Sequence, residues 1–287
     1  MGKCAENSIG LCFLSRLGKF QARIVGKSRG NVLLRKEQYA ISNNEIRSLS
    51  FAKNMIIGKI YNSKWLLERY TRDHAMRVNV EAIKAKSVEL SEILGQIKES
   101  RSLEELRGFE GRAATSYFSV FDDLILNQKD EFFFHGRNKR PPLDRVNCLL
   151  SFLYTILANN TMNALEGVGL DAYVGFFHQD RPGRASLALD MMEELRSAMV
   201  DRLVLSMINK KQIGPDDFEQ EPNGAILMDD DTRKAVLSAW HVKNQEKIQH
   251  PFLDEKISWG LVPYAQAMLL ARQIRGDLDE YPPFLWK

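Results

Sequence analysis

Apolar residues recur at helical spacing over most of this 287-residue chain, and this pattern limits what the chain can fold into. Between residues 43 and 73 the apolar positions include Ile46, Leu49, Ala52, Ile56 and Ile60. A recurrence every three or four residues gives a helix one apolar face that must be buried. The same pattern predicts further helices over residues 79–97, 102–126, 144–166, 186–209, 230–246 and 254–275. We therefore expect a large all-helical domain over residues 41–287.

The first 40 residues follow a different pattern. Residues 11–15 are a short apolar run, residues 16–19 can form a turn, and residues 20–25 alternate between apolar and polar side chains. Alternation with a period of two is typical of a β-strand, so this segment predicts a hairpin. A lone hairpin is only marginally stable in water, so it must pack on another element or pair with strands that the chain lacks. The expected fold class is mainly α, with a small β element over residues 1–40.

The composition excludes some classes of protein and leaves others open. The net charge of +3 allows a nucleic-acid partner, provided that the basic residues gather on one face. No run reaches the ~18 apolar residues that a membrane helix needs, and residues 1–10 lack the apolar core of a signal peptide. Cys4, Cys12 and Cys148 match no zinc pattern and are odd in number, so we expect a reducing, cytoplasmic location.

The first candidate for a functional residue is Glu110, in the segment GFEGRAA over residues 108–114. Gly111 lies inside an otherwise good helix, where glycine costs about 1 kcal/mol relative to alanine. A helix accepts that cost where something must approach its backbone closely, and the small residues beside Glu110 leave room around its carboxylate. The residues alone fit a solvated glutamate beside a helix–helix contact at least as well.

The second candidate is His178, which follows two aromatic residues in the segment GFFHQD over residues 175–180. Arg181 and Arg184 come directly after it. Histidine is the commonest nitrogen ligand for metals in proteins and a common general base. The alternative is a structural histidine that caps the loop between two helices.

The third candidate is an acidic cluster on the helix expected from residue 186. Asp190 precedes Glu193 by three positions and Glu194 by four, so either pair places two carboxylates on one helix face. Like charges at that spacing destabilise an isolated helix by a few tenths of a kcal/mol, and a bound cation would reverse that cost. The alternative is a solvated acidic face, and spacing does not decide between Glu193 and Glu194.

Other motifs are absent or have simpler explanations. The chain has no Walker loop, no G-x-G-x-x-G turn and no H-E-x-x-H sequence. The three aspartates at residues 229–231 are better explained as the cap of the following helix than as a metal cluster. The basic run at residues 137–140 is either a solvated loop or a phosphate-binding segment.

Taken together, five segments resemble one family. Residues 110–114 resemble its E-G-x-x-A motif, residues 175–178 a second motif, and residues 187–196 a third. Residues 140–147 and 281–286 are also similar to it. The family is that of the CRISPR-associated adaptation integrases, the endonucleases of spacer acquisition, and the motifs are most similar to the branch that accompanies type I-C systems. Each motif is weak alone, but their order across nearly the whole chain is specific.

The resemblance implies a metal site and a reaction. In this family a glutamate, a histidine and an acidic residue bind one divalent ion, and the matching positions are Glu110, His178 and Glu193. The resemblance thus favours Glu193 over Glu194, and it makes Asp190 a catalytic acid that supports activity. Oxygen ligands suit Mg²⁺, and one nitrogen ligand favours Mn²⁺, so we expect stronger activity with Mn²⁺. The ion would act as a Lewis acid on the scissile phosphate and activate a water or a DNA 3′-hydroxyl.

The resemblance also implies partners. The family acts on double-stranded and branched DNA as a homodimer joined to a small second adaptation protein, and it inserts short foreign DNA at a CRISPR array. Five arginines are candidates for phosphate contacts, and each is equally suited to a structural ion pair. They are Arg112, Arg137, Arg140, Arg181 and Arg184. Family members usually begin with a longer β-domain that holds dimer contacts, so we expect several leading strands to be missing here.

Two other functions are compatible with the same residues. One is a metal-dependent nuclease on branched or single-stranded DNA without a role in CRISPR adaptation. The other is a non-catalytic, helical scaffold that binds DNA or a protein partner. Strand joining separates an integrase from a plain nuclease, because only the integrase joins a free 3′-hydroxyl end to DNA.

Overall fold

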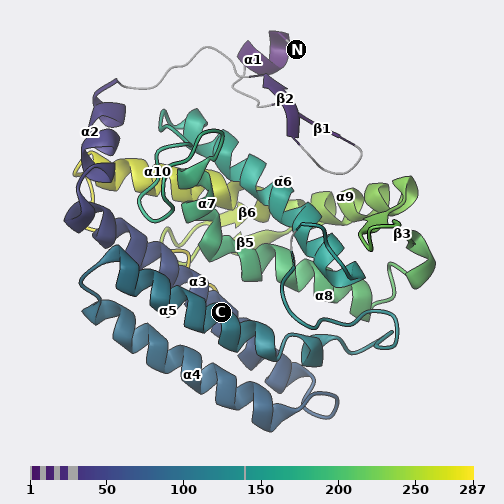
Figure 1. Cartoon of the computed structure of the whole chain (residues 1–287). Helices are drawn as coiled ribbons and strands as arrows, with labels where there is room; N and C mark the ends of the chain where they lie inside the picture. The colour runs from purple at the N-terminus through teal and green to yellow at the C-terminus, as the bar shows by residue number, and fades with distance from the viewer. Residues whose placement is uncertain (1, 7–10, 16–19, 25–31, 139) are drawn as a thin grey trace.

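The computed structural model describes residues 2–6, 11–15, 20–24, 32–138 and 140–287. Figure 1 shows a body built from helices, with a short hairpin beside it, and this confirms the expected mainly α fold. Within the described ranges, strands occur in three two-stranded antiparallel sheets, in which β1 pairs with β2, β3 with β4 and β5 with β6.

The predicted hairpin is present as β1 (Leu11–Leu14) and β2 (Phe20–Ile24), which follow a short helix, α1 (Gly2–Glu6). Leu11 pairs with Ile24, and the register shifts between the last two residues of β1. The predicted turn at residues 16–19 and the end of the second predicted strand lie outside the described residues. The division of the chain at residue 40 stays a prediction.

Helix α2 (Val32–Ser42) was not predicted and precedes the region where helices were expected. Its Gln38 is fully buried, and the side-chain amide donates to the carbonyl oxygen of Asp171 at 2.7 Å. Ser42 donates to the carbonyl oxygen of Gly175, also at 2.7 Å. Its buried face consists of Leu34, Gln38 and Ile41 at helical spacing, and the polar Gln38 interrupts the apolar stripe.

Three long helices form one side of the body, as Figure 1 shows. They are α3 (Glu45–Asp73), α4 (Val80–Glu99) and α5 (Leu103–Ser119). Each is capped by a side-chain oxygen that accepts a hydrogen bond from a backbone N–H in the first turn, at 3.1 Å in all three cases. The capping residues are Asn44, Asn79 and Ser102. Helix α3 packs against both α4 and α5.

Helix α5 ends well before the predicted end near residue 126. The apolar residues beyond it enter the core from a tight turn that contains a 3-10 helix, η1 (Asp122–Leu124). Phe121, Leu124 and Ile125 are fully buried there. A continuously buried turn and a helix face can give the same apolar spacing over so few residues, which explains the overlong prediction.

Helix α6 (Arg145–Gly167) begins as predicted, since Asp144 caps it by accepting from the N–H of Asn147 at 2.6 Å. The single helix expected over residues 186–209 is instead divided into four segments. They are α7 (Ser186–Met192), a 3-10 turn η2 (Glu193–Leu195), a π-helical turn η3 (Arg196–Asp201) and α8 (Arg202–Asn209). Turns of the π type are rare inside helices and occur frequently at functional sites. This irregular stretch begins at Glu193.

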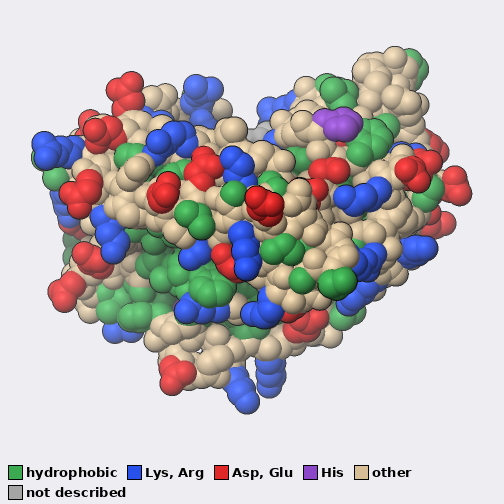
Figure 2. Space-filling view, turned by 90° about the horizontal axis from the view of Figure 1, so that it is seen from below, with side chains coloured by type: hydrophobic (Ala, Val, Ile, Leu, Met, Phe, Trp, Pro, Cys, Tyr) green, Lys and Arg blue, Asp and Glu red, His purple; other side chains and the backbone are tan. Residues whose placement is uncertain are grey.

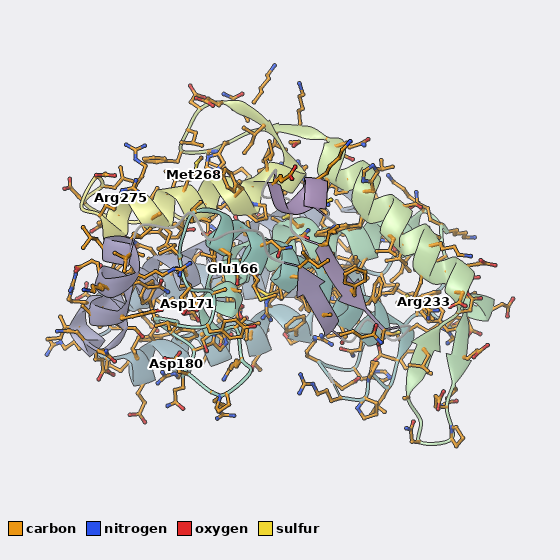
Figure 3. All side chains as sticks on the ribbon, turned by 90° about the horizontal axis from the view of Figure 1, so that it is seen from above. Glu166, Asp171, Asp180, Arg233, Met268 and Arg275 are labelled. Atoms are coloured by element: carbon orange, nitrogen blue, oxygen red, sulfur yellow. The ribbon has the colours of Figure 1, made fainter. Side chains whose placement is uncertain are left out.

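The C-terminal third adds two helices and two small sheets. The remaining elements are η4 (Pro215–Asp217), β3 (Phe218–Gln220), β4 (Ile226–Met228), α9 (Asp230–Gln245), β5 (Lys247–Gln249), β6 (Lys256–Ser258), η5 (Trp259–Leu261) and α10 (Val262–Ile274). Asp229 caps α9 by accepting from the N–H of Thr232 at 2.6 Å, as the sequence indicated. Helix α10 starts later than residue 254 because β6 and η5 come first. Figure 3 shows it along one edge of the body, with Met268 and Arg275 labelled.

Two apolar clusters fix the segments that carry the candidate residues. Phe176 belongs to one cluster and Phe177 to the other, and Met191 and Met192 divide in the same way. The chain just before His178 and just before Glu193 is therefore anchored on both sides, which limits how far either side chain can move. Within the part of the chain described, no helix is both long and apolar enough to cross a membrane.

Candidate active site

Glu110 and Glu193 meet at a single cation, the ammonium group of Lys59. Lys59 of α3 forms an ion pair with Oε1 of Glu110 on α5, and its Nζ lies 2.7 Å from Oε2 of Glu193. The side chains of Lys59 and Glu193 are 15% and 4% exposed, so the pairing is largely shielded from water. The structure thus brings together two of the three predicted metal ligands, from distant parts of the sequence.

Glu193 carries its negative charge in a buried position. Nη2 of Arg196 lies 2.9 Å from its Oε1. Burial alone would raise the pKa of Glu193, but the positive charges of Arg196 and Lys59, with a contribution from His178, lower that pKa to about 2. Burial likewise opposes the charge on Lys59, yet Glu193 and Glu110 hold the pKa of this lysine above its ordinary value.

His178 is oriented by Asp190. Nδ1 of His178 lies 2.6 Å from Oδ1 of Asp190, which is fully buried. The same carboxylate accepts from the backbone N–H groups of Phe176 (2.7 Å), Phe177 (2.9 Å) and His178 (2.9 Å). A carboxylate only accepts, so Nδ1 carries the proton and Nε2 is left with a lone pair for a metal or a proton. Asp190 thus acts through His178 as a positioning residue.

Helix α5 is also tied directly to the histidine segment. Arg107, on the same helix as Glu110, donates from Nη2 to the carbonyl oxygen of Phe177 at 3.0 Å. Its guanidinium also lies over the Phe177 ring, 5.8 Å from the centroid. Arg107 was not among the predicted residues, and no motif identified it.

Two glycines let the backbone segments of the site approach one another. A Cβ atom at Gly175 would lie 2.8 Å from both Oδ2 of Asp190 and Cβ of Ser186. A Cβ atom at Gly58, next to Lys59, would lie 2.8 Å from Cβ of Glu194. By contrast, a Cβ at Gly111 would meet no described atom within 4 Å, so the close approach expected at that glycine does not come from the described part of this chain.

Glu194 binds the C-terminal segment and does not take part in the charge cluster at Lys59. Its carboxylate accepts from Nε2 of Gln266 (2.9 Å), from the N–H of Phe284 (2.8 Å) and from the hydroxyl of Tyr281. Burial raises the pKa of Glu194 to about 7. The sequence spacing left Glu193 and Glu194 equivalent, and the structure places Glu193, not Glu194, beside Glu110.

The donor set fits a hard divalent cation, although Lys59 now lies between the two carboxylates. Oε2 of Glu193 is buried and has Lys59 as a charge partner, but that contact is not aligned as a hydrogen bond. In the described ranges, no three His, Cys, Asp or Glu side chains are close enough together to form a ready cation site. Two carboxylates and an imidazole are ligand types that suit Mn²⁺ or Mg²⁺, and in this structure the ammonium of Lys59 pairs with both carboxylates.

The five predicted DNA-binding arginines differ in their surroundings. Arg137 is half-buried and donates to the carbonyl oxygen of Asn138 and to the hydroxyl of Ser151, at 2.8 and 3.0 Å, so its guanidinium holds its own loop. Arg112, Arg140 and Arg181 are exposed, and Arg184 is half-buried. Figure 2 shows Lys and Arg interspersed with Asp and Glu on one face, without a region of a single sign.

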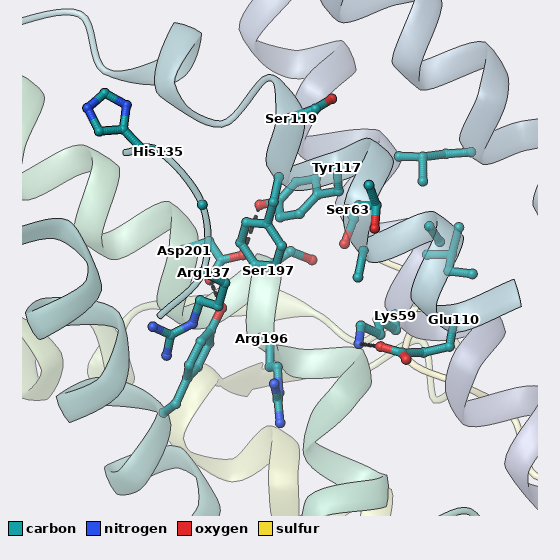
Figure 4. A pocket seen from close by; sticks show the side chains of 18 residues that line it. Lys59, Ser63, Glu110, Tyr117, Ser119, His135, Arg137, Arg196, Ser197 and Asp201 are labelled. Atoms are coloured by element: carbon teal, nitrogen blue, oxygen red, sulfur yellow. Dashed lines mark hydrogen bonds and ion pairs between the residues drawn. The ribbon is translucent and has the colours of Figure 1, made fainter. Parts of the chain in front are cut away.

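A cavity of about 530 Å³ opens beside the paired carboxylates. Lys59 and Glu110 line one side of it, as Figure 4 shows, and His135 and Arg137 line the opposite side. Asp201 also lines the cavity, beside Arg137 in Figure 4, and accepts from the hydroxyls of Tyr117 and Tyr154, at 2.8 and 2.5 Å. Burial raises the pKa of Asp201 to about 6, although both phenols and the nearby arginines favour its charged form.

Solved structures share this helical fold. The fold matches a structure described as "Casposase bound to integration product" with a TM-score of 0.83, at 22% identity, over 98% of this chain and 76% of that one. It also matches a "Cas6-RT-Cas1--Cas2 complex" chain with a TM-score of 0.79, at 23% identity, over 100% of this chain and 30% of that one. Identities this low show a shared fold and no more.

The sequence comparison is more specific. The family described as "CRISPR associated protein Cas1" matches residues 1–242. A relative from Chlorobaculum tepidum, named "CRISPR-associated endonuclease Cas1 1", is 47% identical over 287 residues, which are 100% of this chain and 84% of the relative. The chain belongs to the Cas1 family, and this confirms the family resemblance seen in its motifs.

Proposed function

We propose that this chain is a metal-dependent DNA endonuclease and integrase of CRISPR spacer acquisition. It cuts phosphodiester bonds and joins a prespacer 3′-hydroxyl to the CRISPR array. The observation that carries the proposal is the meeting of Glu110 and Glu193 at one cation, with the imidazole of His178 held nearby by Asp190. The name of the C. tepidum relative, an endonuclease, and the integration product bound in the casposase structure agree with it.

A divalent ion, Mn²⁺ or Mg²⁺, would be held by Glu110, His178 and Glu193. When bound, it supplies Lewis-acid stabilisation of the reacting phosphate and makes a nearby water or 3′-hydroxyl more acidic. Glu193 is ionised at neutral pH, because its pKa is lowered to about 2. The lone pair on Nε2 of His178 either binds the ion or accepts the proton of the attacking hydroxyl, and Asp190 stabilises the imidazolium that results.

The partners proposed are DNA, a second copy of the chain and the small second adaptation protein. The Cas1–Cas2 complex among the structures with this fold supports the protein partner. Arg140 and Arg181 are exposed and would be accessible to phosphates. Arg112 is also exposed, but it donates to Oε1 of Gln96 and lies over the Phe109 ring, and Arg137 and Arg184 are less accessible. Membership of the type I-C branch stays a prediction.

The test is a DNA-processing assay with a matched pair of variants on one helix. A labelled branched DNA is incubated with the chain in Mn²⁺, Mg²⁺ or EDTA, and both cleavage and joining of a 3′-hydroxyl end are followed. Glu110→Gln removes the candidate ligand, and Glu104→Gln changes an exposed carboxyl on the same helix. We expect joining that requires metal, is strongest in Mn²⁺, and is lost in Glu110→Gln alone. Cleavage without joining would support the plain nuclease, and equal activity in both variants would contradict the assigned site.

A further inference from the structure

Residues 281–286, called the strap below, lie against both helical stretches that carry the paired charges of the site. Asn62 of α3 is 2% exposed, and its side-chain amide donates to the carbonyl oxygens of Glu194 and Phe284, at 2.7 Å in both cases. Its Oδ1 accepts from the N–H of Trp286 at 2.8 Å. One buried amide thus joins α3, the turn η2 and the strap.

Glu194 is the main anchor of the strap, and its side chain is fully buried. Its carboxylate accepts from the hydroxyl of Tyr281, from the N–H of Phe284 at 2.8 Å and from Nε2 of Gln266 at 2.9 Å. The same Nε2 also donates to the Tyr281 hydroxyl, at 2.6 Å. Both carboxylate oxygens are therefore bonded, and hydrogen bonds to a charged acceptor are stronger than those between neutral groups. The strap and α10 together hold this side chain in one position.

Glu194 follows Glu193 directly, so contacts that fix one residue also restrict the other. Both lie in the 3-10 turn η2, where backbone hydrogen bonds have poorer geometry than in an α-helix. A Cβ atom at Gly58 of α3 would lie 2.8 Å from Cβ of Glu194 and 3.2 Å from Cβ of Pro283. Lys59 follows this glycine, so the strap also packs against the part of α3 that carries the ammonium group.

A metal ligand needs support that persists when the ion binds. The carboxylate of Glu193 pairs with Lys59 and Arg196, and an ion bound at this carboxylate would replace the pairing with the lysine. The contacts of Glu194 involve none of the predicted ligands, so they can persist. Functional groups must stay within about 0.5 Å of their productive geometry, and groups that orient a metal ligand are typically worth about 10–100-fold in metal affinity or activity.

We propose that the strap positions the metal ligand Glu193 through its neighbour Glu194. Tyr281 and Asn62 are the positioning residues. Tyr281 holds the side chain of Glu194, and Asn62 holds its carbonyl oxygen and ties the strap to α3. The strap thereby fixes where the carboxylate of Glu193 lies relative to that of Glu110. Loosening the strap weakens the binding of a divalent ion in molecules that are still folded. This inference rests on the proposed function.

The first test compares two tyrosine variants by calorimetric titration with Mn²⁺. Tyr281→Phe removes the hydroxyl that donates to Glu194 and keeps the buried ring. Tyr70→Phe is the matched control, because its hydroxyl also belongs to a buried ring and accepts from Nδ2 of Asn209, at 3.3 Å. Tyr70 lies roughly three helical turns beyond Lys59 on α3. We expect Tyr281→Phe to weaken Mn²⁺ binding about tenfold or more, and Tyr70→Phe to bind Mn²⁺ as the wild type does.

A second pair of variants tests the contact from α3. Asn62→Ala removes the two hydrogen bonds to the carbonyl oxygens of Glu194 and Phe284. Asn159→Ala is its control, because it removes a buried amide that donates to the carbonyl oxygen of Thr155 within α6, at 2.8 Å. We expect Asn62→Ala to weaken Mn²⁺ binding about tenfold or more, and Asn159→Ala to retain the wild-type affinity.

The electron paramagnetic resonance spectrum of bound Mn²⁺ separates positioning from a loss of stability. The spectrum depends on how the ligand atoms are arranged around the ion, and it reports only on metal-bound molecules. We expect Tyr281→Phe and Asn62→Ala to change this spectrum. The two controls should keep the wild-type spectrum, although they melt at a lower temperature than the wild type. Unchanged Mn²⁺ affinity and an unchanged spectrum in the folded strap variants overturn the proposal.

The titration of the wild type separates this inference from the proposed function. If the wild-type chain binds no Mn²⁺, the proposed metal site fails and the positioning role of the strap fails with it. If the wild type binds Mn²⁺ and the folded strap variants bind it equally tightly, only the positioning role fails. The titration needs no DNA, so its result does not depend on whether the chain joins DNA or only cuts it.

Discussion

His178 and Asp190 form one hydrogen-bonded unit, in which Nδ1 of the imidazole lies 2.6 Å from Oδ1 of a fully buried carboxylate. The same carboxylate accepts from three successive backbone N–H groups, so it fixes both the imidazole and the loop that carries it. Nε2 of His178 is thereby presented with its lone pair, which both metal binding and proton transfer require.

Asp190→Asn should therefore weaken metal binding without unfolding the protein. An amide at this position donates as well as accepts, so the tautomer of His178 and the loop hydrogen bonds are no longer both satisfied. Outer partners of metal-binding histidines are typically worth about 10–100-fold in affinity or activity. We expect a loss of that size in Mn²⁺ affinity, measured by calorimetric titration. Asp130→Asn, at an exposed position outside this loop, is the control and should retain wild-type affinity.

Gly175→Ala should move the same carboxylate by steric means. The new Cβ would lie 2.8 Å from Oδ2 of Asp190 and from Cβ of Ser186, distances at which something must shift. Overpacking of this kind costs about 1–3 kcal/mol in the free energy of unfolding, measured in urea. Gly95→Ala is the control, because a Cβ there meets no described atom within 4 Å on an exposed helix position. That change should stabilise the protein by about 0.5–1 kcal/mol. The reverse order of stabilities would contradict the role assigned to Gly175.

Lys59→Met should lower the stability of the metal-free protein. It should also increase the stabilisation that a bound metal ion gives, relative to the wild type. Without the ammonium, Glu193 loses one of its two charge partners, and breaking a buried ion pair costs up to about 3–5 kcal/mol. A divalent ion then enters without displacing a cation, and a ligand that binds only the folded state raises its stability. We expect Mn²⁺ to raise the melting temperature more in Lys59→Met than in the wild type. Lys84→Met, at an exposed position, should show the wild-type response to Mn²⁺, and an equal response in Lys59→Met would exclude competition between lysine and metal.

Much of the helical fold was predictable, because buried helix faces leave a clear apolar period. The helices predicted from residues 102 and 144 begin where expected, with Ser102 and Asp144 as their capping residues, and Asp229 caps α9 as the sequence indicated. The failures occurred where a buried helix position is polar, or where buried apolar residues are not helical. Helix α2 buries the polar side chain of Gln38. The turn after Ser119 buries apolar residues although it does not continue the α-helix.

The site itself was only partly visible in the sequence. The three segments around Glu110, His178 and Glu193 were found from their motifs, but the break at Glu193 was not, because a π-helical turn keeps almost the same residue spacing as an α-helix. Lys59 was missed. It lies next to Gly58 on a helix face that is otherwise buried, and a lysine beside a tightly packed glycine indicates a charge that needs a buried partner. Lys59 joins the carboxylates because α3, α5 and the turn η2 come together in the folded chain. The spacing of apolar residues along the sequence does not show which helices lie side by side.

Asp201→Asn should change how stability depends on pH. The folded-state pKa of Asp201 is raised to about 6 from an ordinary value of 3.8, so between these values the folded chain holds a proton that the unfolded chain has released. This group therefore contributes stability below about pH 4, and that contribution is lost as the pH rises through about 6. Asparagine does not titrate, and the hydroxyls of Tyr117 and Tyr154 can still accept from and donate to its amide. The stability of the wild type relative to Asp201→Asn should thus fall by up to about 3 kcal/mol between pH 4 and pH 7, measured by urea unfolding. A difference that stays constant over this range would show that Asp201 titrates normally in the folded chain.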